Sequence, residues 1–119
     1  MKEYMLIFRH EDGSKIASPE QMQIWMKATM DWLKGIADQG KFDGKGQGLI
    51  FDNAKVVHHG GVVTNGPFGE IKETLGGYVI VKADSVEEAV EFAKGSPILG
   101  GPGNTIEVRL LTTDDGVHQ

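Results

Sequence analysis

The amino-acid sequence predicts one α+β domain. The chain has 119 residues, a length that supports one hydrophobic core and not two. Short apolar runs typical of strands alternate with two segments of helical periodicity. No internal repeat and no linker divides the chain. We therefore expect a single domain over residues 1–113, followed by a C-terminal tail at residues 114–119.

Two segments in the first third of the chain have strong local signals. Residues 4–8 are apolar in both alternating sets, which is typical of a strand covered on both faces. Ser18, Pro19 and Gln21 predict a helix start, with an N-cap, a proline at the first helical position and a capping box. Gly40 is the expected stop. The stripe at helical spacing consists of Met22, Trp25, Met26, Thr29, Leu33 and Ile36, with Trp32 on its flank.

The middle of the chain predicts turns and short strands. Residues 44–48 are a flexible, Gly-rich connection, and residues 49–51 follow as a short strand. Gly60-Gly61, between the runs at 55–59 and 62–64, indicates a hairpin with a two-residue turn.

The last third predicts a strand, a helix and a strand. Residues 77–82 have the apolar character of a buried strand. Asp84 and Ser85 offer two overlapping caps for a short helix that ends at Gly95. Residues 105–111 are the final strand.

This order fits a ferredoxin-like antiparallel sheet with two helices on one face. Two helices cannot cover both faces, so alternate residues of 4–8 and of 78–81 would stay bare. The resulting apolar patch would be larger than monomers usually expose. A second copy of the sheet would cover it, and we predict a two-fold homodimer.

The composition excludes several classes of protein. The formal net charge is −5 and no three basic residues stand together, whereas phosphate binding relies on a local excess of Lys and Arg. The absence of cysteine excludes disulfides, thiolate nucleophiles and Cys-type zinc sites. The N-terminal apolar run is too short for a signal segment or a membrane span. We expect a cytoplasmic protein with no nucleic-acid or membrane partner, no metal and no cofactor.

Residues 62–78, which read VVTNGPFGEIKETLGGY, resemble the signature of the DGPF subgroup of the YCII-related proteins. The resemblance covers roughly residues 2–111, and its flanking pieces are residues 5–7, 32–33, 83–89 and 106–109. It implies the dimeric α/β-barrel superfamily, in which two ferredoxin-like protomers pack sheet against sheet and leave a cleft. It implies no particular reaction.

Two departures from the family pattern bear on catalysis. The motif usually begins with Asp, and here it begins with Asn65, which cannot act as a base and is a poorer metal ligand. Simpler YCII-like members have a proposed His–Asp pair. An approximate alignment puts Thr29 and Ser96 in those two places, so the pair is not carried over to this chain.

Glu107, Arg109 and His10 are the catalytic candidates. Glu107 and Arg109 share one face of the last strand, and the apolar residues that alternate with them share the other. If the apolar set packs on the helices, Glu107 and Arg109 point to the cleft. Arg109 could hold a carboxylate or phosphate bidentately, or the two residues could form a structural ion pair. His10 could be a general base at the cleft rim or a solvated histidine at the strand end.

The predicted ligand-binding set is completed by Asn65, Phe68 and Trp32. Asn65 and Phe68 either line the cleft or shape a turn and fill the core or dimer seam. Trp32 belongs to the core, the interface or a stacking site. His58 and His59 point to opposite faces of a strand, so they do not form a chelating pair.

These patterns favour a small dimer whose cleft binds an anionic organic molecule, with proton-transfer or isomerase-type chemistry suggested by fold-level analogy. A non-catalytic ligand-sensing or accessory module is the alternative. A third interpretation is a cleft filled by side chains in a protein that serves as an interaction partner.

Overall fold

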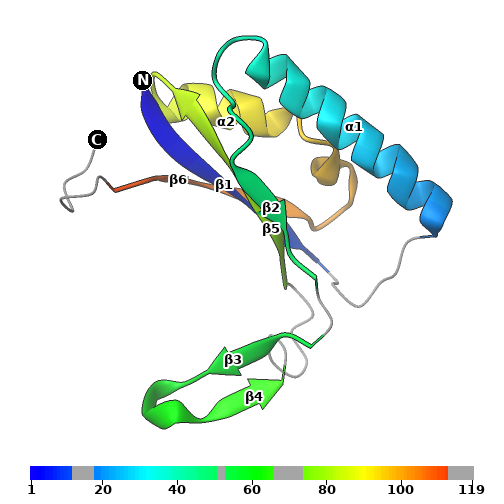
Figure 1. The fold of residues 1–119 in the computed structure, drawn as a ribbon, viewed down its shortest axis with the longest axis vertical. Coiled ribbons are helices and arrows are strands. Elements are labelled where there is room, and N and C mark those ends of the chain that lie inside the picture. The colour runs from blue at the N-terminus through cyan, green and yellow to red at the C-terminus, as the bar shows by residue number, and fades with distance from the viewer. Residues whose placement is uncertain (12–17, 51–52, 66–73, 113–119) are drawn as a thin grey trace.

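A computed structural model describes residues 1–11, 18–50, 53–65 and 74–112 of the chain (Figure 1). They form the predicted α+β fold, with a four-stranded antiparallel sheet, two helices and a separate β-hairpin. The strand order is β2-β5-β1-β6, which is the ferredoxin-like order. The strands are β1 (Lys2–His10), β2 (Gly46–Gly48), β5 (Thr74–Ala83) and β6 (Thr105–Leu110).

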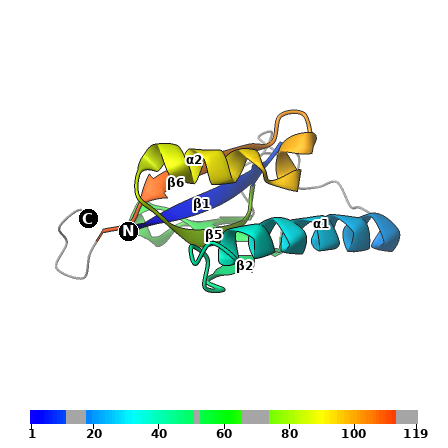
Figure 2. The same cartoon turned by 90° about the horizontal axis from the view of Figure 1, so that it is seen from above.

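Both helices lie on one face of the sheet (Figure 2), as the sequence predicts. Helix α1 (Pro19–Ala37) begins with the expected capping box: the Ser18 hydroxyl accepts a hydrogen bond from the Gln21 amide, and the Gln21 side chain accepts one from the Ser18 amide. Helix α2 (Val86–Lys94) takes Ser85 as its N-cap and ends at Gly95. A short 3-10 helix, η2 (Pro97–Gly100), follows.

The hydrophobic core lies between the sheet and the helices. Alternate residues of β1 and β5 supply most of it, so the strand period of two decides which side chains are buried. Leu6 and Val81 are completely buried at its centre. The buried cluster consists of Tyr4, Leu6, Ile36, Val79, Val81, Ala83, Ala89 and Ala93.

The opposite side of the sheet is called the open face below. It carries the other alternating set, and its apolar centre is Met5, Ile7, Tyr78 and Ile80. Met5 lies opposite Ile80 and Ile7 lies opposite Tyr78 across β1 and β5. These four residues are half-buried, although the two helices cover only the other side of the sheet.

The predicted strand at residues 49–51 is wrong at residues 49 and 50, and residue 51 lies outside the described residues. The edge strand β2 lies just before them, in the stretch predicted to be a flexible connection. Gly46 explains this, because a Cβ atom there would lie 2.7 Å from the Tyr78 carbonyl oxygen. Glycine lets β2 approach β5 closely, whereas Ile50 is 84% exposed.

The hairpin forms as predicted, but its first strand is shorter, its second strand is shifted by one residue, and its turn is longer. Strands β3 (Lys55–Val57) and β4 (Val63–Asn65) pair with each other, and the 3-10 helix η1 (His59–Gly61) lies between them. Gly60 and Gly61 both have φ of +85°. The His58 amide donates to the Val62 carbonyl at 2.7 Å and closes the turn outside the two glycines.

The apolar stripe of α1 is packed along only half of its length. Ile36 is buried and Trp32 and Leu33 are half-buried, whereas Met22 and Met26 are exposed. The N-terminal half of α1 extends past the sheet in Figure 1, and there Trp25 meets the sheet at His10, the last residue of β1.

Candidate functional site

The candidate residues divide between the two sides of the sheet. Glu107 and Arg109 lie on the open face, where β6 pairs with Ile7 and Met5 of β1. His10 and Trp32 lie on the helix side, in contact with Trp25 and Phe8 respectively. The structure therefore brings the first two together and separates them from the other two.

Glu107 lies between two arginines on the open face. Its carboxylate is 3.0 Å from Nη1 of Arg109 and 3.5 Å from Nη2 of Arg9. The hydrogen bond from Arg109, joined by the charge of Arg9, holds the pKa of Glu107 below its ordinary value against the opposing effect of desolvation. Glu107 is thus ionised at neutral pH and acts as a weak proton acceptor.

The arginine cluster, defined as Arg9, Glu107 and Arg109, has one positive charge in excess. The side chain of Arg109 is 68% exposed although one of its nitrogens is bonded to Glu107. A guanidinium has five N–H donors in a planar fork, so Arg109 can bind a second anion while it keeps its bond to Glu107. The cluster adjoins the apolar centre of the open face, because Met5 and Ile7 are the direct neighbours of Arg109 and Glu107 on β1.

A second set of ion pairs lies at the other end of the same face. Lys45 is 3.3 Å from Glu3 and 4.0 Å from Asp43, and Lys82 is 3.7 Å from Asp43. Along β1 the open face therefore runs from Glu3 through apolar Met5 and Ile7 to Arg9. This is an apolar centre between two charged ends.

His10 lies on the helix side of β1, next to a β-bulge in β5. Phe8 pairs with Gly77 and Arg9 pairs with Leu75, which leaves Gly76 as the extra residue of β5. The His10 ring lies against Gly76, where a Cβ atom would come within 2.1 Å of it. Burial lowers the pKa of His10, so its imidazole is neutral at neutral pH.

Trp32 joins the two helices. Its Nε1–H donates to the Phe92 carbonyl at 2.8 Å, and its ring meets Phe8 edge-on at 6.1 Å between centroids. Gly95 gives it room, since a Cβ atom there would lie 3.2 Å from the indole ring. This geometry fits the core interpretation of Trp32 rather than a ligand-stacking one.

Thr29 and Ser96, the two positions aligned above with a proposed His–Asp pair, both have buried hydroxyls. Ser96 is buried and its hydroxyl caps η2 by accepting from the Ile98 amide. The Thr29 hydroxyl is buried without a hydrogen-bond partner among the described residues. Neither group is a base at neutral pH.

The remaining candidates belong to the hairpin region. Asn65 is exposed at the end of β4, where its side chain accepts a hydrogen bond from Lys55. The His58 ring lies 2.9 Å from the Thr64 hydroxyl. Within the described ranges, no three or more His, Asp or Glu side chains are placed to hold a metal. Phe68 lies outside the described residues.

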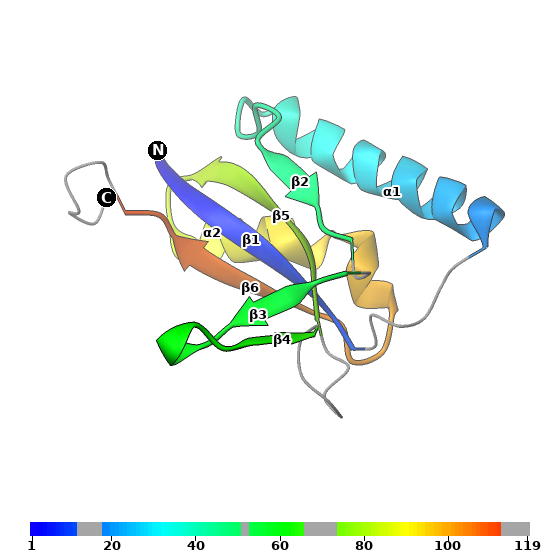
Figure 3. The same ribbon diagram turned by 60° about the horizontal axis from the view of Figure 1, so that its bottom comes forward.

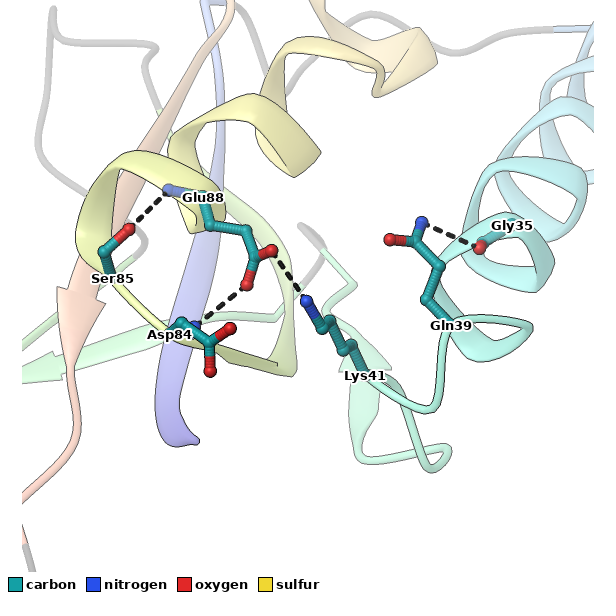
Figure 4. Close-up of polar contacts among 6 residues, drawn as sticks. All are labelled: Gly35, Gln39, Lys41, Asp84, Ser85 and Glu88. Carbon is teal, nitrogen blue, oxygen red and sulfur yellow. Dashed lines mark hydrogen bonds and ion pairs between the residues drawn. The ribbon is translucent and has the colours of Figure 1, made fainter.

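Sequence patterns did not reveal the ion pair between Lys41 and Glu88 (Figure 4). The carboxylate of Glu88 also accepts the Asp84 amide at 2.9 Å, and the Glu88 amide donates to the Ser85 hydroxyl at 3.2 Å. The hydrogen bond between the two side chains raises the pKa of Lys41 and lowers that of Glu88. Because the pair connects the segment after α1 to the start of α2, its role is structural.

Comparison of the sequence with known proteins gives one positive finding. The model of the YCII-related domain matches residues 2–112. No curated protein matches the chain. In the part of the chain that the structure describes, neither α1 nor α2 combines the length and the apolar character needed to traverse a bilayer.

Proposed function

Since the chain belongs to the family of YCII-related domains, we propose that it acts as a homodimer whose open faces meet and bind an anionic organic molecule between them. The observation that supports this proposal is the arginine cluster beside the apolar centre of the open face. The proposal has two steps, the pairing of two sheets and the binding of an anion.

The pairing of two sheets rests on the apolar centre. Met5, Ile7, Tyr78 and Ile80 form a continuous strip that both helices leave bare. Two such sheets pack face to face at about 10 Å, which places the strips in contact. The charged ends of each face then lie at the rim, where ion pairs keep their contact with water.

The binding of an anion rests on Arg109. A carboxylate at the rim between two sheets would meet the exposed side of its guanidinium, whose planar fork of donors suits a carboxylate. Glu107 orients Arg109 and limits the net positive charge, so a monoanion is the best-matched ligand. The apolar strip beside it suits an organic body rather than an inorganic ion.

A binding or sensing role is favoured over proton transfer by the position of His10. Its neutral imidazole lies on the helix side of the sheet, across the backbone from Arg109. The ionised Glu107 beside Arg109 is a weak base. A ligand bound at Arg109 would thus meet no strong proton acceptor among the described residues of the open face.

Sedimentation velocity and thermal-shift measurements test this function. The wild type should sediment at about twice the 12.9 kDa mass of one chain. Benzoate, succinate and acetate should be screened, and benzoate should raise the melting temperature most because its ring matches the apolar strip. Arg109→Gln should abolish that rise, and Lys27→Gln, which alters an exposed ion pair on α1, should keep it. A monomeric wild type, or an Arg109→Gln variant that still responds, would contradict the proposal.

A further inference from the structure

The β3–β4 hairpin stands apart from the four-stranded sheet. Its two strands pair with each other as a separate sheet. It projects on the open-face side of the molecule in Figure 1, and it crosses in front of that face in Figure 3. A hairpin with three residues in each strand is marginally stable in water without further packing. We call residues 55–65 the arm.

One side of the arm is apolar and uncovered. Val57 lies directly opposite Val63, and their exposed fractions are 69% and 56%. Val62 next to them is also exposed. The opposite side holds Val56 and Thr64, which are half-buried. The arm therefore has apolar side chains in need of cover, which we call the valine ridge: the facing pair Val57 and Val63 on one side, and Val62 where the turn joins β4.

We propose that the valine ridge packs against a second copy of this chain, so that the two arms of a dimer each clasp the other protomer. This inference rests on the dimer proposed above and adds a second contact surface to it. The β3–β4 hairpin and the open face lie on the same side of the molecule, so a partner that covers the open face comes within reach of the arm. Two-fold symmetry then supplies two such contacts.

The area of the open face also favours a second contact. Stable dimers bury about 1,200–2,000 Å² in total. The apolar centre of the open face offers only four residues, and these are already half-buried in one chain. Three exposed valines from each arm enlarge the apolar part of the interface, and both surfaces become covered in one assembly.

Charged substitutions on the ridge test the clasp. The double variant Val57→Lys/Val63→Lys should raise the dimer dissociation constant at least about tenfold in sedimentation equilibrium, since the burial of two valines is lost. The matched control is Val86→Lys, which changes an exposed valine of α2 on the helix side and should leave the constant unchanged. Far-UV circular dichroism should show the same secondary structure in all three proteins.

A cross-linking experiment identifies what the arm touches. The chain has no cysteine, so Val62→Cys introduces a unique thiol for a benzophenone label. In an equal mixture of ¹⁴N and ¹⁵N chains, cross-linked peptides should pair the two isotopes. Links only within one chain would show that the arm folds onto its own sheet, and would overturn the inference.

The two proposals can fail separately. If the wild type sediments as a monomer, both the proposed function and the clasp are wrong. If the wild type is a dimer and Val57→Lys/Val63→Lys leaves its dissociation constant unchanged, only the clasp is wrong.

Discussion

The ammonium of Lys41 lies 2.6 Å from the carboxylate of Glu88. The backbone of Lys41 also accepts a hydrogen bond from the Lys82 amide at 2.7 Å. Lys41, in the segment that follows α1, thus contacts both the end of β5 and the first turn of α2. This connection fixes the end of α1 that carries Ile36, the buried residue of that helix.

Acid should weaken this connection. The pKa of Glu88 is lowered in the folded protein, so its contribution to stability is present above the unfolded value of 4.5 and is lost as the pH falls through the folded value. In urea unfolding between about pH 5 and pH 3, the free energy of unfolding should fall less steeply for Glu88→Gln than for the wild type. Glu91→Gln, which alters an exposed pair with Lys94, should follow the wild type. Equal slopes for all three would mean that Glu88 is not coupled to folding.

Removal of the indole N–H of Trp32 should destabilise the protein, because it removes a hydrogen bond between α1 and α2. Trp32→Phe removes the 2.8 Å hydrogen bond from the indole to the Phe92 carbonyl, which keeps its bond from the Gly95 amide, and should lower the free energy of unfolding by about 1 kcal/mol. Trp25→Phe is the control, because Trp25 is 41% exposed, and we expect a change within about 0.5 kcal/mol. Chemical denaturation followed by circular dichroism compares the two, and a reversed order would contradict the role given to Trp32.

Neighbouring residues of β1 should respond differently to truncation. Leu6 is fully buried under the helices, so Leu6→Ala should cost about 2–5 kcal/mol at any protein concentration. Met5 lies on the open face, and Met5→Ala should act mainly by weakening the proposed dimer. The melting temperature of Met5→Ala should therefore depend more strongly on protein concentration than that of Leu6→Ala. A concentration-independent effect of Met5→Ala would contradict this assignment.

Two glycine-to-alanine substitutions should change the stability of the protein in opposite directions. A Cβ atom at Gly46 would lie 2.7 Å from a backbone oxygen of β5, so Gly46→Ala should destabilise the protein by about 1–3 kcal/mol. Gly35 is inside α1, and nothing lies within 4 Å of its Cβ position. Gly35→Ala should stabilise the protein by about 0.5–1 kcal/mol through the helix propensity of alanine. Thermal unfolding of the two variants measures both signs.

Local chemistry predicts much of the fold. The start of α1 is correct in detail because Ser18 and Gln21 complete each other's hydrogen bonds within one turn. The strand period of two correctly separates Leu6 from Met5 and Ile7 and puts Glu107 and Arg109 on one face, but it leaves open which set packs against the helices. The same period, applied to Arg9 and His10, would have put His10 on the side away from the arginine cluster.

The remaining features depend on contacts between distant parts of the chain. β2 forms at Gly46, where the backbone of β5 comes close. The residues near Gly46 in the sequence do not indicate that β5 will lie there. The ion pair of Lys41 and Glu88 joins residues 47 positions apart. The outer half of α1 has helical periodicity, yet periodicity cannot say where the sheet ends beneath it.

The position of β1 has a consequence for how the protein is made. β1 lies inside the sheet, and both of its partners, β5 and β6, come from the C-terminal part of the chain. During translation its apolar run emerges from the ribosome well before either partner exists. Pairing across such a separation is slow, and unpaired apolar strands are prone to aggregate. The strand at the centre of the finished sheet is therefore a segment of the nascent chain that a chaperone would protect.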